Sequence, residues 1–208
     1  MNNVDFKNSV VLVEEVLKKR SIEITEIVYL SSNDGRRIGP YIRKTFDCDC
    51  GLGNAYQTLF NSQTTQCEHI ANVYSVFEKE NKLYVFEEYI NGQTLDSYIG
   101  KLDFDVGVIS QLFVELCNAL NFLHTNFSAP IIHRDIKPSN ILITKSGQVK
   151  LIDFGISRNY EENENTDTYK FGTVGYASPE QFGYKQTDVR SDIYSLGKVL
   201  EFMCDVKN

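Results

Sequence analysis

The chain has 208 residues, of which 42% are hydrophobic and 24% charged, a composition typical of one or two soluble globular domains. Its 21 basic and 28 acidic residues give a net charge of −7, which argues against nucleic acid or an anionic membrane as a partner. The sequence has no uninterrupted run of about 18 apolar residues, and its first twenty residues include acids where a signal peptide is apolar. Its five cysteines are scattered, so we expect a cytoplasmic protein with reduced thiols.

The first ninety residues have a mainly β-like pattern. Residues 5–20 have the apolar spacing of a short amphipathic helix, although the run Val10–Val13 would also suit a strand. Residues 21–46 resemble a β-hairpin in their pattern, with a turn signal at Asp34–Gly35 and Lys44 on the second strand. We expect a helix over about residues 52–63 and two further strands in residues 69–90, ended by Asn91–Gly92.

The second half of the chain alternates helices with short strands. Apolar residues recur every three or four positions from Asp105 to His124, which predicts an amphipathic helix whose apolar face lies in the core. ILIT and VKLID form two predicted strands joined at Ser146–Gly147. The polar, acidic residues 158–171 have the composition of a surface loop, and a last helix should begin near Asp192.

Residues 132–157, IHRDIKPSNILITKSGQVKLIDFGIS, contain the groups that phosphoryl transfer requires. Such a reaction needs a carboxylate to orient a hydroxyl and receive its proton, and oxygen ligands for Mg²⁺. Asp135, Asn140 and Asp153 supply these groups, and Lys137 adds a cation. The predicted hairpin would bring Asp153 beside Asn140, and Gly155 would allow a sharp turn after it. The alternative is two polar turns whose aspartates only close loops.

HRDIKPSN followed by DFG resembles the catalytic and metal-binding loops of eukaryotic-type protein kinases. GTVGYASPE resembles the end of a kinase activation segment, and TDVRSDIYSLGKVLEFMC resembles the helix buried in the large lobe. The resemblance covers about residues 21–208. It implies an α+β, two-lobed protein-kinase-like fold: an antiparallel β small lobe with one helix over residues 1–90, and a mainly helical, C-terminally truncated large lobe over residues 91–208.

The resemblance also implies a role for each matching residue. Asp135 would be the general base, Asn140 and Asp153 the Mg²⁺ ligands, and Lys137 the mark of serine/threonine specificity. Thr173 would bridge Asp135 and Lys137. The remaining implied contacts are to ATP: Lys44 to the α- and β-phosphates, the backbone of Glu88 and Ile90 to adenine, and Thr94 near the ribose.

Two further roles concern the loops around the catalytic aspartate. By the resemblance, Asp192 holds the backbone of the catalytic loop, and Arg134 binds a phosphate carried by the activation segment. We therefore expect phosphorylation at Thr166 or Thr168, with an unswitched surface loop as the alternative. The arginine that in the family pairs with the glutamate matching Glu180 has no counterpart in the sequence.

The predicted small lobe departs from the family pattern at two motifs. The glycine positions of the phosphate-binding turn align with Ser21, Glu23 and Glu26, whose carboxylates would repel a triphosphate. In place of the helix glutamate that pairs with the lysine, the predicted helix offers Gln57 or Asn61. A buried Glu87 behind the adenine would itself need a partner, and Lys44 is a candidate.

The principal functional hypothesis is an ATP- and Mg²⁺-dependent kinase that phosphorylates serine or threonine hydroxyls of protein substrates. The alternatives are a kinase-like module that binds nucleotide or a partner with little turnover and, ranked last, a small-molecule kinase. Because the family's later helices are missing after the last predicted helix, we expect partly uncovered apolar residues there, namely Leu196, Val199, Leu200 and Phe202. Either another copy of the chain covers this surface, or the segment from about Thr187 onward is loosely held and the catalytic loop loses its anchor at Asp192.

Overall fold

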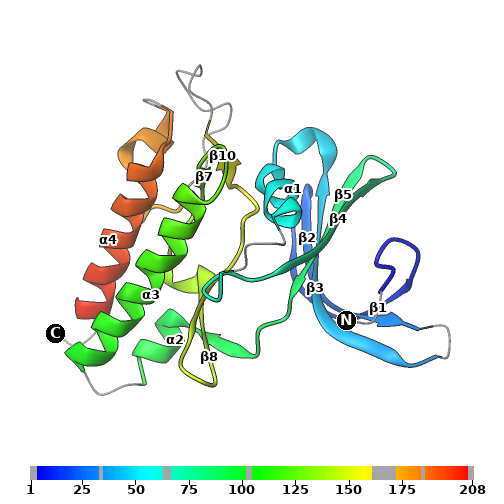
Figure 1. The fold of residues 1–208 in the computed structure, drawn as a ribbon, viewed down its shortest axis with the longest axis horizontal. Helices are drawn as coiled ribbons and strands as arrows, with labels where there is room; N and C mark the ends of the chain where they lie inside the picture. The colour runs from blue at the N-terminus through cyan, green and yellow to red at the C-terminus, as the bar shows by residue number, and fades with distance from the viewer. Residues whose placement is uncertain are drawn as a thin grey trace. The chain divides into compact units, whose positions relative to one another are not determined.

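The fold is that of a computed structural model, which describes residues 4–32, 35–62, 67–101, 105–160, 172–183 and 186–205. The chain forms two compact units (Figure 1). Unit 1 comprises Met1–Gln63 and Ala71–Tyr89, and unit 2 comprises Thr64–Ile70 and Ile90–Asn208. Each unit has its own secondary structure and its own buried residues.

Unit 1 is built on an antiparallel sheet of five strands in the order β1-β2-β3-β5-β4, as expected for the small lobe. A short 3-10 helix, Cys48–Cys50, and helix α1, Asn54–Asn61, follow the third strand. The strands are β1 (Val10–Lys19), β2 (Glu23–Ser31), β3 (Arg37–Asp47), β4 (Val73–Lys79) and β5 (Lys82–Glu88).

Strand β1 replaces the helix that the apolar spacing of residues 5–20 suggested. Its β-branched residues favour an extended backbone, and pairing with β2 supplies the hydrogen bonds that a helix would have made internally. The turn into β2 consists of Arg20, Ser21 and Ile22, and the Arg20 amide closes it by donating to the Glu23 carbonyl at 2.8 Å. The helical interpretation of this segment is therefore wrong.

One face of the unit 1 sheet carries an aromatic core covered by the N-terminal segment. Val28, Leu30 and Phe86 are almost fully buried there. The ring centroid of Phe6 lies 5.1 Å from those of Tyr41 and Phe86. Residues ahead of β1 thus complete the core on this face, and the opposite face carries Lys44.

Unit 2 contains the three remaining α-helices of the described residues and two small sheets. Its helices are α2 (Leu95–Ile99), α3 (Val106–Thr125) and α4 (Val189–Asp205). One sheet has the order β6-β8-β9, from β6 (Gly92–Thr94), β8 (Ile141–Thr144) and β9 (Val149–Leu151); the other pairs β7 (Ile131–Ile132) with β10 (Arg158–Asn159). The predicted hairpin at Ser146–Gly147 joins β8 and β9. Two 3-10 helices span Pro138–Asn140 and Pro179–Phe182.

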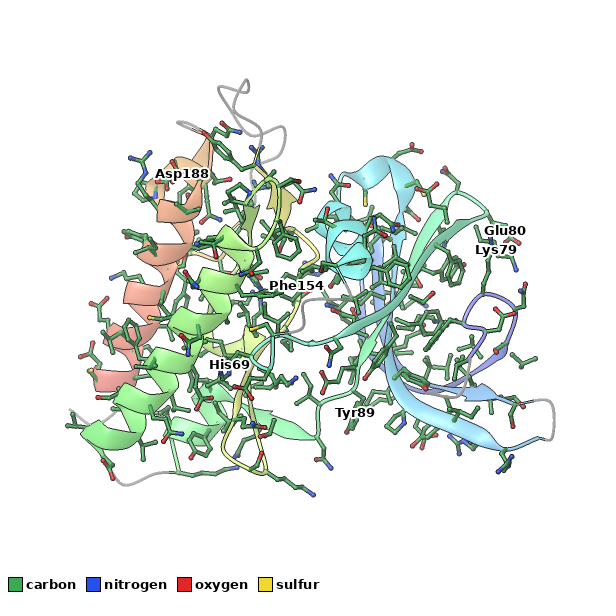
Figure 2. All side chains as sticks on the ribbon, viewed as in Figure 1. His69, Lys79, Glu80, Tyr89, Phe154 and Asp188 are labelled. Atoms are coloured by element: carbon green, nitrogen blue, oxygen red, sulfur yellow. The ribbon has the colours of Figure 1, made fainter. Side chains whose placement is uncertain are left out.

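The segment before β4 belongs to unit 2 because it pairs with β9. Ile70 forms a parallel bridge with Leu151, whose amide donates to the His69 carbonyl at 2.8 Å. The His69 imidazole is 7% exposed and lies 3.6 Å from a carboxylate oxygen of Glu115 on α3 (Figure 2). Backbone pairing therefore ties this short segment to β9, and the His69 ring lies beside α3.

Helix α3 begins where the sequence predicts, with Asp105 as its N-cap accepting a hydrogen bond from the Gly107 amide at 2.7 Å. In length and composition it is the single helix among the described residues that could span a membrane. A core helix has the same composition, and α3 buries one face in unit 2. That face consists of Ile109, Leu112, Leu116, Ala119, Leu120 and Leu123.

Helix α4 lies beside α3 and is better covered than we expected (Figure 1). Leu196 and Val199 are 5% and 0% exposed, so the expectation that they are partly uncovered is wrong. Leu200 and Phe202 are half-buried. Ile193 is the most exposed of the large apolar residues in this helix, at 58%.

Candidate active site

The catalytic loop of unit 2 is anchored by a buried carboxylate. Asp192, at the start of α4, is 0% exposed and accepts hydrogen bonds from the backbone amides of His133 at 2.8 Å and Arg134 at 2.9 Å. These bonds hold Arg134 at a φ of 70°, a conformation that non-glycine residues rarely adopt. The expected role of Asp192 therefore has a geometric basis. His124 of α3, which the sequence did not single out, also lies 2.9 Å from this carboxylate.

His133 connects the catalytic loop to the loop that follows β9. Its Nδ1 accepts from the Asp135 amide at 3.3 Å, which leaves Nε2 to donate to the Ile152 carbonyl at 3.2 Å. Its ring packs edge-on against Phe154, with centroids 4.9 Å apart. Burial lowers the pKa of His133, against the opposing effect of Asp192. The imidazole is therefore a neutral link between the two loops.

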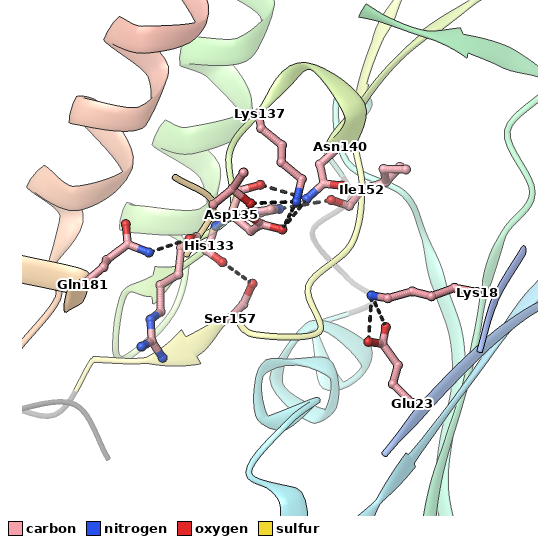
Figure 3. Close-up of polar contacts among 11 residues, drawn as sticks. Lys18, Glu23, His133, Asp135, Lys137, Asn140, Ile152, Ser157 and Gln181 are labelled. Atoms are coloured by element: carbon pink, nitrogen blue, oxygen red, sulfur yellow. Dashed lines mark hydrogen bonds and ion pairs between the residues drawn. The ribbon is translucent and has the colours of Figure 1, made fainter. Parts of the chain in front are cut away.

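Asp135 lies in a network with the three polar residues that the sequence placed around it (Figure 3). Lys137 Nζ lies 2.7 Å from Asp135 Oδ2, and Asn140 Nδ2 donates to the same oxygen at 2.9 Å. Thr173 Oγ1 donates to Asp135 Oδ1 at 2.6 Å and accepts from Lys137 Nζ at 2.9 Å. Both carboxylate oxygens are thereby held in position.

Asn140 and Asp153 fit a hard cation such as Mg²⁺ in donor type. Because Asn140 Nδ2 donates to Asp135, the Oδ1 atom of the same amide is the group left to ligate a cation. The Ile152 amide donates to the Asn140 carbonyl at 3.0 Å, which brings the loop carrying Asp153 to the catalytic loop. The left-handed φ, 68°, falls on Asp153 itself, whereas we expected Gly155 to make the turn.

The end of the activation segment is tied to both the catalytic loop and α4. Gln181 is 1% exposed, and its Nε2 donates to the Arg134 carbonyl at 2.7 Å. Glu180 accepts a hydrogen bond from Ser191 Oγ at 2.6 Å. Partial burial alone would raise the pKa of Glu180, but hydrogen bonds from Ser191 and its surroundings lower it. Glu180 thus has a polar partner within α4. The expected phosphorylation sites, Thr166 and Thr168, lie outside the described residues.

In unit 1, Lys44 is buried and paired within the sheet. Its side chain is 6% exposed, and Nζ lies 3.1 Å from Glu87 Oε2 on the neighbouring strand. The residue of α1 that contacts Lys44 is Tyr56, whose hydroxyl accepts from Nζ at 2.7 Å. Gln57 is exposed and donates instead to Asn61 at 3.0 Å. The predicted Glu87 pair therefore forms, whereas the predicted contact from Gln57 or Asn61 is replaced by Tyr56.

The glutamates expected to face a triphosphate have cationic partners of their own. Both lie in β2 rather than in the turn, so the alignment of the glycine positions with Ser21, Glu23 and Glu26 is wrong. Glu23 lies 2.7 Å from Lys18 Nζ (Figure 3). Glu26 points to the other face of the sheet, where Arg43 lies 2.6 Å away.

The three residues expected near the nucleoside have the following local contacts. In unit 1, Glu88 is bound through its carboxylate by Asn72, and its amide donates to the Asn72 carbonyl at 2.8 Å. In unit 2, the Ile90 carbonyl accepts from the Gly92 amide at 3.0 Å, and Thr94 Oγ1 donates to Ser97 Oγ at 3.1 Å.

One aspartate is held in a loop by a lysine, an asparagine and a threonine, and a second loop beside it carries another aspartate. This is the arrangement expected of a phosphoryl-transfer centre. Residues 54–207 match the protein kinase domain family, and the chain belongs to that family.

Relatives in bacteria support the assignment to this family. The chain is 41% identical over 143 residues to a probable serine/threonine-protein kinase of Clostridium acetobutylicum, covering 67% of this chain and 21% of the relative. It is 38% identical over 164 residues to a probable serine/threonine-protein kinase PknB of Lactococcus lactis, covering 76% of this chain and 25% of the relative. The chain therefore spans about a quarter or less of the length of these relatives.

Proposed function

We propose that this chain transfers the γ-phosphoryl group of ATP to serine or threonine hydroxyls of protein substrates. The observation that carries the proposal is the network around Asp135, in which Lys137 and Thr173 contact each other as well as the carboxylate. The serine/threonine-protein kinase names of the relatives agree with it. The lysine two residues after the aspartate supports hydroxyl rather than tyrosine specificity.

The functional residues of unit 2 have separate roles in the phosphoryl transfer. Asp135 orients the substrate hydroxyl and accepts its proton as the oxygen attacks phosphorus. Lys137 and Thr173 keep the carboxylate in position and place a positive charge beside the transferring group. Asn140 and Asp153 would hold Mg²⁺, which neutralises phosphate charge when bound. In unit 1, Lys44 contacts the phosphates.

Incubation of the purified chain with Mg²⁺-ATP and a generic protein substrate tests the proposal. We expect phosphate on serine or threonine, dependence on Mg²⁺, and no phosphotyrosine. The same assay is run on a version extended through any native downstream sequence. Absence of transfer from both versions would contradict the proposal.

A second candidate function is a kinase-like module that binds nucleotide or a partner with little turnover. It is favoured by unit 1, where the β1–β2 turn contains no glycine and Lys44 is paired with Glu87 of the sheet rather than with a carboxylate of α1. Calorimetry, combined with the transfer assay, separates the two candidates. A binding module binds ATP but shows no detectable phosphoryl transfer at any enzyme concentration, whereas a kinase binds ATP and transfers its phosphoryl group.

We place this activity in the cytoplasm and expect protein substrates rather than nucleic acid or membranes. All five cysteines, which fall within the described ranges, are free thiols, as a reducing compartment requires. Self-association through α4 stays a prediction. Of the surface from which it was predicted, Leu200 and Phe202 are the residues that are still partly exposed. Sedimentation velocity at micromolar concentration tests it, with a concentration-independent monomer as the contrary result.

A further inference from the structure

The β1–β2 turn of unit 1 is too short and too side-chain-rich to bind phosphate through backbone amides. It has three residues, none of them glycine, and the Arg20 amide is used to close the hairpin. A phosphate cradle of amides needs glycine because side chains keep the backbone away from the ligand. Nucleotide binding on this sheet therefore needs another source of positive charge.

Lys18 lies in the same cross-strand row as Lys44. The register pairs Lys18 of β1 with Thr25 of β2, and Thr25 with Lys44 of β3. Directly paired residues point to the same face of a sheet, and neighbouring strands are about 4.8 Å apart. The two lysines therefore flank one threonine on one face, about 10 Å apart at their Cα atoms. Their long, flexible stems can reach a common ligand above Thr25.

Each of the two lysines is held by a buried glutamate from the neighbouring strand. Lys18 Nζ lies 2.7 Å from Glu23, and Lys44 Nζ lies 3.1 Å from Glu87. The two glutamate side chains are 6% and 4% exposed, so each carboxylate requires a cation to offset its desolvation. Each pair holds its ammonium group on this face of the sheet. Lys18 remains 29% exposed, which leaves part of its side chain open to a ligand.

We propose that Lys18 is a second phosphate-binding cation, which with Lys44 takes over the role of backbone amides in binding the phosphates of a nucleotide. The inference rests on the proposed function, because it requires that Lys44 contacts phosphate. Its ligands are nucleoside di- and triphosphates. Glu23 acts as a positioning residue that keeps the Lys18 ammonium over the Lys44 face of the sheet.

The chain contains a matched control at the adjacent position. Lys19 has the same charge and is exposed, but it pairs with Ile24 and points to the opposite face of the sheet. Replacing it changes the net charge as much as replacing Lys18. A difference between the two variants therefore reports the position of the charge.

The test is calorimetric binding of adenosine, ADP and ATP to the wild-type chain and to K18M, K19M and K44M. We expect K18M to weaken ADP and ATP binding about tenfold, the loss of one charge-assisted contact. Adenosine binding should not change, and K19M should match the wild type for all three ligands. Because K18M leaves the Glu23 carboxylate without its ammonium, K18M/E23Q is measured beside it, with thermal unfolding of both.

The outcomes separate this inference from the proposed function. If K44M weakens ATP binding and K18M/E23Q does not differ from K19M, the role of Lys18 is refuted and the kinase assignment stands. Equal losses for adenosine and ATP in K18M/E23Q would show that Lys18 only supports the hairpin. If the wild-type chain binds neither ADP nor ATP, both the inference and the proposed function fail.

Discussion

Unit 2 and unit 1 fix their functional side chains in different ways. In unit 2, Asp135 is held mainly by residues two and five positions along the same loop, with Thr173 completing the network. In unit 1, Lys44 is held by Glu87, which reaches it only through the register of β3 and β5. The first arrangement depends on a loop motif and the second on strand pairing. Contacts within a motif can be inferred from the spacing of its residues. Contacts between strands cannot, because a slip of one residue in register moves a side chain to the other face.

The sharpest test of the unit 2 network is Asp135→Asn, which keeps the shape of the side chain and removes the base. We expect phosphoryl transfer to fall by roughly 10²- to 10⁴-fold while nucleotide binding is retained. Asp153→Asn should weaken Mg²⁺-ATP binding as well, because it removes a cation ligand. Turnover and calorimetric affinity are measured on both variants. Equal loss of affinity in the two would contradict the separate roles.

Loss of the Asp192 anchor of the catalytic loop should lower the free energy of unfolding more than loss of any other single contact of the site. Asp192→Asn replaces an acceptor of two backbone amides by a group that is half donor, leaving a buried N–H without a partner. We expect the free energy of unfolding to drop by about 2–4 kcal/mol. Urea denaturation measures it. The matched control is Asp188→Asn, whose carboxylate pairs with the exposed Arg190 and should matter much less. Similar losses in both variants would remove the anchor interpretation.

In unit 1, Glu87→Gln tests whether strand pairing positions Lys44, because it removes the negative charge beside that lysine. We expect ATP affinity to fall about tenfold, because the ammonium loses the carboxylate that positions it. In a Lys44→Met background the same change should have no further effect, which a double-mutant cycle measures. Gln57→Ala on the exposed side of α1 is the control and should bind as the wild type does. An unchanged affinity in Glu87→Gln would show that α1, through Tyr56, positions the lysine alone.

The sequence predicts unit 2 better than unit 1 for identifiable physical reasons. Helix α3 and the β8–β9 hairpin follow directly from periodicity and turn chemistry. The run Val10–Val13 fits a helix face and a strand equally well, and only pairing with β2 decides between them. Whether Tyr56 or Gln57 faces Lys44 depends on how α1 rotates to bury its apolar side.

Other contacts of the site were missed for want of any signal in sequence spacing. His124 contacts Asp192, which lies far from it in the chain, and Gln181 contacts the Arg134 carbonyl from the end of the activation segment. No motif marks either residue as a partner in these contacts. The pair between Lys18 and Glu23 depends on the register of β1 and β2. This register contains β-bulges that cannot be inferred from the sequence alone. The kinase resemblance predicted the contacts of Asp192 with the catalytic-loop backbone and of Thr173 with Asp135 and Lys137, because these contacts belong to the shared pattern.

The smallest predicted effect concerns the hydrogen bond that Ser191 of α4 donates to Glu180 at the end of the activation segment. Because the folded-state pKa of Glu180 lies below 4.5, its usual value, the ionised group stabilises the fold above about pH 4.5. That contribution is lost as the pH falls through the lowered pKa. Ser191→Ala removes the hydroxyl donor, so we expect about 0.5–1 kcal/mol less stability at pH 7. At a pH below the lowered pKa the difference should shrink. Urea unfolding of both proteins across this range measures it, and a difference that is constant with pH would mean that Ser191 stabilises α4 without acting on the Glu180 carboxylate.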